Sequence, residues 1–176
     1  MAGTLKVGTI TTPSGSGTIT IPSGVTLSGV SNTPAFMAYL TSSQSIANST
    51  DTKIQCNSEI VDTNSAYDNS TNYRFTVPVD SAGKYLVFWQ VRRGNFSSTT
   101  LRGIVYINGS ASNIATSENY NGSATYASAG NSIILNLSVG DYIELYAHQN
   151  SGSSNSIYGS GTDKATYFGA YKLLGV

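Results

Sequence analysis

The sequence is short of charge, histidine and cysteine. Only 10% of its 176 residues are charged, the formal net charge at pH 7 is zero, and it holds one histidine and one cysteine. Soluble proteins usually carry about 25% charged residues, so hydroxyl and amide groups must keep this surface hydrated. A neutral chain lacks the basic face that displaces counterions from nucleic acid, and we expect no such partner. Arg92 and Arg93, adjacent basic residues, are expected at a solvated strand end.

Long apolar runs are also missing. No stretch approaches the roughly 20 apolar residues of a membrane helix, so we expect no membrane insertion. No apolar segment of the kind found in secretory signals follows the first eight residues, which predicts a protein that is not secreted. Cys56 has no partner for an internal disulfide, and it is expected to be a small buried hydrophobic residue rather than a reactive thiol.

The scarcity of catalytic side chains argues against an enzyme. His148 is the one histidine, so a histidine-rich metal site is impossible and a serine-type triad would depend on it alone. Asp141 and Glu144 could pair as acid and base, but Asp141 lies in an expected turn. Asp62 and Asp68 lack the regular alternation of a calcium-binding loop, and we expect them to be solvated carboxylates. We therefore predict no catalytic residue, no cofactor and no bound metal.

Small polar residues and strand formers are abundant. The chain has 18 Gly and 12 Tyr, and short runs of β-branched and aromatic residues recur at the spacing of a β-sandwich. This pattern predicts an all-β domain over residues 34–176. The expected strands are 34–40, 52–59, 73–78, 85–91, 101–107, 133–137, 142–147 and 165–174.

Three segments of this domain give further expectations. Residues 85–91 are almost wholly apolar, so both faces of this strand should be covered. The dipeptide Asn108-Gly109 predicts a two-residue hairpin turn. Residues 110–131 are expected to form a long functional loop, unless they hide a short strand.

Residues 1–33 are predicted to form a separate, extended β arm. Its apolar positions mostly alternate, as in strands, and Pro-x-Gly turns separate them. Short strands cannot bury such positions alone, because a two-stranded hairpin is marginal in water. We therefore expect the arm to dock on another protein or on sister chains; the alternative is a flexible linker. The apolar arm positions are Leu5, Val7, Ile10, Ile19, Ile21, Val25 and Leu27.

A series of motifs in one order carries a family resemblance. They are the Pro34-Ala35-Phe36 opening, the turn from Phe75 to Gly83 that leads into Tyr85, the hairpin Tyr106-Ile107-Asn108-Gly109, the turn Val139-Gly140-Asp141 and the closing Tyr167-Phe168-Gly169. Over residues 34–174 this series resembles the head domain of the complement-subunit-q and tumour-necrosis-factor superfamily. The resemblance implies a two-sheet antiparallel jelly-roll sandwich that forms a homotrimer and binds partners instead of catalysing a reaction.

The chain also departs from secreted members of that superfamily. It shows no collagen-like Gly-X-Y stem, no secretion signal and no second cysteine. The run Thr-Pro-Ser-Gly-Ser-Gly-Thr-Ile-Thr at residues 12–20 instead resembles the N-termini of tail-fibre and other virion proteins of marine bacteriophages. That resemblance implies a virion protein that assembles in the host cytoplasm.

Strand parity separates core from surface in the last two strands. Aliphatic residues share one face of each strand and predict core, whereas tyrosines share the other face and predict a partner, because exposed aromatic rows mark contacts. In the resembled family the Tyr-Phe-Gly tyrosine lies near the trimer axis, which implies that place for Tyr167. The alternative is that some of these tyrosines are ordinary surface residues. The predicted trimer contacts are Tyr142, Tyr146, Tyr167 and Tyr171.

Two polar loops, 117–131 and 150–162, are candidate binding surfaces. They mix Tyr with Ser, Gly and Asn, as antibody loops do, and three copies on one trimer would strengthen weak binding through avidity. The alternative is that they are only uncharged, soluble loops. The candidate host-binding residues are Tyr120, Asn121, Tyr126, Asn150 and Tyr158.

These expectations combine into a hypothesis of function. The chain is predicted to be a non-enzymatic virion protein, a homotrimeric knob that residues 1–33 anchor to other virion proteins. In this role it would decorate the capsid and could contact the host surface. The first alternative is a tail-fibre or tail-tip protein that recognises host surface glycans. The second is a cellular carbohydrate-binding or adhesion module.

Overall fold

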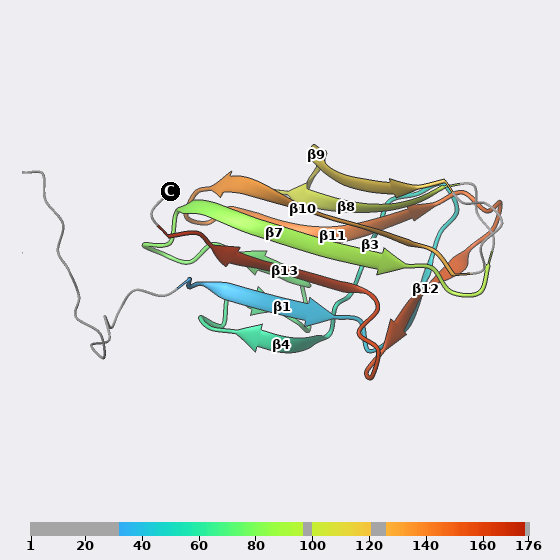
Figure 1. Ribbon diagram of the computed structural model, residues 1–176, viewed down its shortest axis with the longest axis horizontal. Helices are drawn as coiled ribbons and strands as arrows, with labels where there is room; N and C mark the ends of the chain where they lie inside the picture. The colour runs from blue at the N-terminus through green and yellow to red at the C-terminus, as the bar shows by residue number, and fades with distance from the viewer. Residues whose placement is uncertain (1–31, 97–99, 121–125, 175–176) are drawn as a thin grey trace, which may run out of the picture. The chain divides into compact units, whose positions relative to one another are not determined.

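Thirteen strands and no helix make up the residues that this computed structural model describes, 32–96, 100–120 and 126–174 (Figure 1). Contacts group the chain from Asn32 onward into one compact unit. The seven apolar arm residues and Asn121 lie outside the described ranges. Nothing within those ranges forms a helix that could cross a membrane. The strands are β1 (Ala35–Tyr39), β2 (Ser42–Ile46), β3 (Thr52–Lys53), β4 (Ser58–Asp62), β5 (Tyr67–Asp68), β6 (Arg74–Thr76), β7 (Gly83–Arg92), β8 (Leu101–Ile107), β9 (Ser110–Asn119), β10 (Ser128–Leu137), β11 (Tyr142–Gln149), β12 (Asn155–Ser160) and β13 (Tyr167–Lys172).

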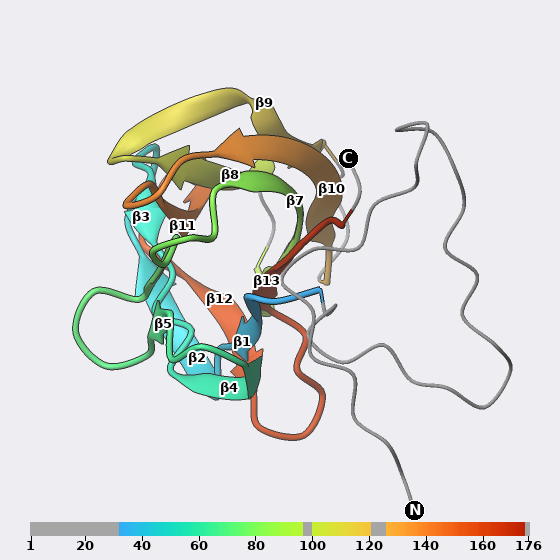
Figure 2. The same ribbon diagram turned by 90° about the vertical axis from the view of Figure 1, so that its left-hand side faces the viewer.

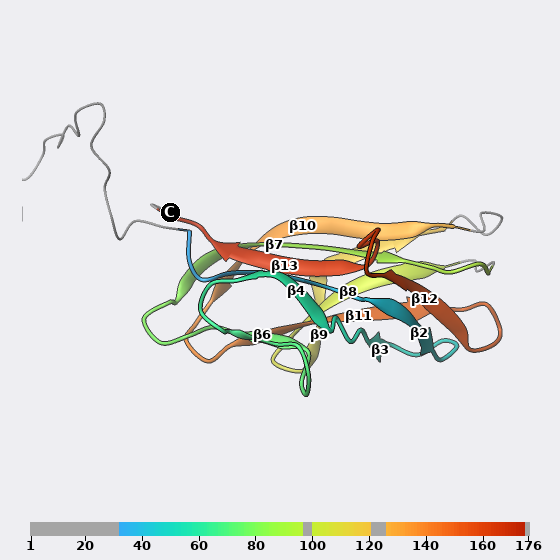
Figure 3. The same ribbon diagram turned by 90° about the horizontal axis from the view of Figure 1, so that it is seen from below.

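Two main sheets pack face to face. One has five strands in the order β10-β7-β13-β1-β4; the other has six, with the order β5-β6-β11-β8-β9 and β3 also paired to β11. A small sheet joins β12 to β2. All pairings are antiparallel. Figure 2 shows the two layers end-on and Figure 3 shows them from below. The predicted all-β, antiparallel jelly-roll sandwich is confirmed.

The two ends of the sandwich have different contents. At one end, which we call the base, the domain begins and finishes, and the Lys172 N–H donates to the Pro34 carbonyl at 3.1 Å. At the opposite end, the distal end, Gln149, Leu101 and Asn119 lie in register across β11, β8 and β9. Figure 1 shows the base on the left and the distal end on the right.

Strand β7 shows how the sequence builds one face of the core. Its residues alternate between buried (Tyr85, Val87, Trp89, Val91) and half-buried (Leu86, Phe88, Gln90). Within one chain the core covers only one face of 85–91, because a strand of an antiparallel sandwich gives one face to the opposite sheet; cover of both faces stays a prediction for the assembled protein. The second face points outward from the five-stranded sheet.

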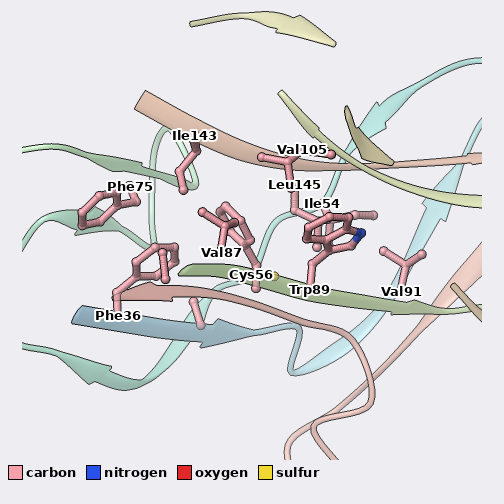
Figure 4. Packing of buried hydrophobic residues seen from close by; sticks show 14 of the residues in the cluster. Phe36, Ile54, Cys56, Phe75, Val87, Trp89, Val91, Val105, Ile143 and Leu145 are labelled. Carbon is pink, nitrogen blue, oxygen red and sulfur yellow. The ribbon is translucent and has the colours of Figure 1, made fainter. Parts of the chain in front are cut away.

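Aromatic and aliphatic side chains fill the core between the sheets (Figure 4). Phe36 stacks on Phe75 with ring centroids 4.8 Å apart. Towards the distal end, the Trp89 indole N–H donates to the Ser117 hydroxyl at 2.9 Å, so its polar atom is satisfied. Cys56 is fully buried, and this burial raises the pKa of its thiol. The prediction of a small buried hydrophobic residue at this position is confirmed.

Polar strands account for most of the segments expected as loops. Residues 110–131 contain β9 and the start of β10, which leaves only 120–127 between them. Likewise β12 lies within 150–162, so Tyr158 is a strand residue. For 110–131 the alternative of a hidden strand is the correct one, and the expectation of a loop at 150–162 is wrong. The physical reason is that backbone pairing with β8, β7 and β2 forms these strands without apolar alternation. The Asn108-Gly109 hairpin is confirmed, with φ of 52° and 79° as a type I′ turn requires.

Asp62 and Asp68 shape the chain around β5. The Asp62 carboxylate accepts hydrogen bonds at 2.9–3.3 Å from backbone N–H groups between residues 64 and 67. Asp68 accepts at 2.9–3.0 Å from the N–H groups of residues 70–72, and these bonds hold its pKa below the usual range. Between them lies Tyr67, a buried residue whose hydroxyl donates to the Cys56 carbonyl at 3.0 Å.

Candidate functional site

The outward face of the five-stranded sheet carries an apolar surface. Tyr171 of β13 pairs with Leu86 of β7, which pairs in turn with Ile134 of β10. One row further on, Val61 of β4 pairs with Met37 of β1. Because cross-strand partners project from the same side, these side chains gather on one face. We call it the apolar sheet face; it comprises Met37, Val61, Leu86, Phe88, Ile134, Tyr167 and Tyr171.

Gly169 explains why glycine follows Tyr167 and Phe168 in the closing motif. A Cβ atom at this position would lie 2.7 Å from Cε2 of Phe88 and 2.8 Å from the backbone oxygen of Phe36. Glycine thus leaves room for the Phe88 ring to lie against β13. The ring then stands 6.3 Å from that of Tyr167, and both line a shallow depression in the apolar sheet face.

The four predicted trimer tyrosines lie on two different sheets. Tyr167 and Tyr171 belong to the apolar sheet face, whereas Tyr142 and Tyr146 project outward from β11 in the other sheet. Arg74 lies 4.3 Å from the ring centre of Tyr142. Tyr146 stacks on a neighbouring tyrosine of β8 with ring centroids 3.7 Å apart. The two pairs therefore cannot form one continuous surface.

A polar network covers the outward face of the six-stranded sheet. Lys53 pairs with the buried Glu144 at 2.5 Å. Asp51 accepts a hydrogen bond from the Tyr106 hydroxyl at 2.7 Å and lies 2.9 Å from His148 Nδ1. Burial, followed by this bond to Asp51, raises the pKa of Tyr106 to about 12. The network is one of mutually paired side chains that tie β3, β8 and β11 together.

The side chains considered above as acid–base candidates have hydrogen-bond or ion-pair partners within the chain. Glu144 and His148 lie in the network just described. Asp141 accepts hydrogen bonds from the Ser138 N–H at 2.7 Å and from Asn108 Nδ2 at 2.8 Å, and these bonds lower its pKa. Across the described ranges, no three His, Cys, Asp or Glu side chains come together as a metal site.

Four of the five candidate host-binding residues can be placed, all towards the distal end. Tyr120 and Tyr126 flank the 121–125 segment and are 70% and 56% exposed. Asn150 follows β11, and its side-chain oxygen accepts a hydrogen bond from the Thr100 N–H at 2.9 Å. Tyr158 is held by a 2.8 Å bond from its hydroxyl to Asp163.

Arg92 is half-buried, whereas Arg93 is buried. The guanidinium carbon of Arg92 lies over two tyrosine rings, 5.2 Å from the centre of Tyr126 and 5.1 Å from that of Tyr158. Arg93 is fully buried, and burial lowers its pKa. The expectation of two solvated arginines is wrong for Arg93, because strand parity turns it into the sandwich. The stacking role of Arg92 was missed, since Tyr126 and Tyr158 are distant from it in sequence.

Comparison with known families identifies the fold. A family model of the C1q domain matches residues 35–173. The chain belongs to the C1q-domain family. No curated protein sequence matches it.

Solved structures share the fold of this C1q domain at low sequence identity. Murine APRIL at pH 8.5 is 16% identical over 79% of this chain and 99% of its own, with a TM-score of 0.57. Eiger TNF from S. frugiperda is 14% identical over 79% and 91%, with a TM-score of 0.60. The globular domain of the zebrafish complement 1qA protein is 15% identical over 80% and 97%, with a TM-score of 0.56. These likenesses support the fold.

Proposed function

We propose that this C1q domain is the head of a homotrimeric, non-enzymatic knob. The observation that carries the proposal is the apolar sheet face, where Ile134 and Val61 are 55% and 41% exposed on the outward side of the five-stranded sheet. Contiguous exposed apolar patches mark interaction sites, and obligate subunit contacts are the most apolar class. Association of three copies through this face would bury Leu86, Phe88 and Tyr167.

Light scattering on the full chain tests the oligomer. Leu86→Glu places a charge in the middle of the apolar sheet face, so we expect a monomer where the wild type is a trimer. Ile114→Glu is the matched control, because Ile114 is 70% exposed on β9 of the other sheet, and this variant should remain a trimer. A monomeric wild type would refute the proposal.

We further propose that the knob is a virion component, assembled in the host cytoplasm and anchored to the capsid by residues 1–33. Support comes from the virion-like run at residues 12–20 and from the polar composition with zero net charge. The described domain begins at its base, so an anchor there leaves the distal end outward. The partners would be capsid proteins and two sister chains.

Immunogold labelling of intact particles tests this placement. An antibody raised against residues 34–176 should label the shell if the protein decorates the capsid. Label confined to the tail would replace decoration with a tail-tip role, and unlabelled particles would rule out a virion protein.

A host-binding tip is the second candidate, favoured by the exposed Tyr120 and Tyr126 at the distal end. Exposed tyrosines offer large rigid contact areas at low entropic cost. Replacing Tyr120, Tyr126 and Tyr158 together by alanine should abolish adsorption of particles to host cells. Unchanged adsorption would exclude this candidate. A cellular carbohydrate-binding module, the remaining alternative, predicts a monomer in the light-scattering experiment.

A further inference from the structure

We propose that the distal end binds the carboxylate of an acidic sugar, with Arg92 as its anchor between Tyr126 and Tyr158. The inference rests on the proposed function only in needing the distal end to face outward. It adds the residues of a site and the class of ligand.

The surroundings of Arg92 suit an anion. Its guanidinium lies over the Tyr126 and Tyr158 rings, an arrangement that cation–π attraction favours. A guanidinium stacked on rings keeps its N–H donors along its edge, where they match the two oxygens of a carboxylate. Lys53 and Arg102 have carboxylate partners within the chain, but no described carboxylate forms an ion pair with Arg92.

The elements around Arg92 are fixed to one another. The Thr166 hydroxyl accepts a hydrogen bond from the backbone N–H of Arg92 at 3.1 Å and donates to the backbone carbonyl of Tyr158 at 2.7 Å. The nearby Asp163 carboxylate is occupied, because it accepts a bond from the Tyr158 hydroxyl at 2.8 Å. Thus β7, β12 and the ring of Tyr158 are positioned before any ligand arrives. Such preorganisation reduces the entropic cost of binding.

The exposed ring of Tyr126 points to a sugar rather than to an isolated anion. At 56% exposure it keeps apolar area beyond its contact with Arg92, and this area can pack against a sugar ring. A guanidinium and an aromatic ring side by side therefore complement a sugar that carries a carboxylate. Three such sites on one trimer would bind a repeating acidic polysaccharide with avidity.

The test compares two forms of one oligosaccharide by calorimetry on the full chain. A galacturonate trisaccharide should bind, and its methyl ester, in which a methyl group neutralises each carboxylate, should bind about tenfold more weakly or not at all. Arg92→Gln should lose the preference for the acid. Arg102→Gln, on the outward face of the six-stranded sheet, should keep it. Equal binding of acid and ester by the wild type would overturn the proposal.

Two further measurements separate the site from general charge and from folding. Arg92→Lys keeps the cation but not the planar pair of donors, so it should weaken binding of the acid by about tenfold with the fold intact by circular dichroism. Full binding by Arg92→Lys would overturn the carboxylate assignment. Tighter binding of a trisaccharide that carries sulfate groups and no carboxylate would overturn it as well. Light scattering on the same samples distinguishes failure here from failure of the trimer, since a trimer that ignores the acid contradicts only this inference.

Discussion

At the residue scale, Gly169 determines how closely Phe88 packs against β13. The Cβ of Gly169→Ala would meet the backbone oxygen of Phe36, which β1 holds in place, as well as the Phe88 ring. Overpacking of this kind costs about 1–3 kcal/mol. We predict a loss of that size in the free energy of unfolding, measured by urea denaturation. Gly161→Ala, where no atom lies within 4 Å of the added Cβ, should change it by less than about 0.5 kcal/mol. Equal losses would contradict the packing argument.

Asp68 gives a prediction for pH. Hydrogen bonds from backbone N–H groups lower its pKa in the folded state below the ordinary value. A carboxyl with a depressed folded pKa adds stability above its unfolded pKa and loses it as the pH falls through the folded value. Wild type should therefore lose more stability than Asp68→Asn between about pH 5 and pH 2. Thermal unfolding at both pH values measures this, and parallel losses would show that Asp68 does not contribute.

At the scale of elements, Asn108 joins two turns at the base. Its side chain donates to Asp141 at 2.8 Å and accepts from the Tyr142 N–H at 2.9 Å, while its own φ is 52°. Asn108→Ala loses both bonds and adopts this φ less readily, so we predict a loss of about 1–3 kcal/mol in urea denaturation. Asn108→Gly keeps the turn and loses only the bonds, so its stability should lie between that of the wild type and that of Asn108→Ala. Wild-type stability in both variants would show that the link is unimportant.

The elements also show which parts of the fold a sequence can reveal. A strand with apolar alternation, such as β11, is predicted well because burial of one face imposes a period of two. Strands β2, β9 and β12 have too few apolar residues for that signal. These strands form instead because their backbones pair with neighbouring strands. Strand parity correctly places the Tyr167 side chain on the face away from the core. It does not show to which sheet each strand with a predicted contact tyrosine belongs.

At the scale of the whole molecule, each proposed function belongs to a different part of the protein. The apolar sheet face would hold sister chains, the arm would bind the capsid, and the distal end would stay free for a ligand. The Arg92 site illustrates the limit of sequence reasoning, because residues from β7, from the segment before β10 and from β12 meet only in the folded domain. Composition alone indicated the tyrosines as candidates and gave no signal for their partner.

The two tyrosine pairs allow the trimer to be tested separately from the stability of the chain. Because association stabilises the folded state by mass action, the wild-type Tm should rise with protein concentration. Tyr167→Ser removes contact area from the apolar sheet face and should weaken that dependence. Tyr142→Ser instead loses the stacking of Arg74 within one chain, so it should lower the Tm equally at all concentrations. If Tyr142→Ser rather than Tyr167→Ser removed the concentration dependence, the subunit contact would lie on the six-stranded sheet.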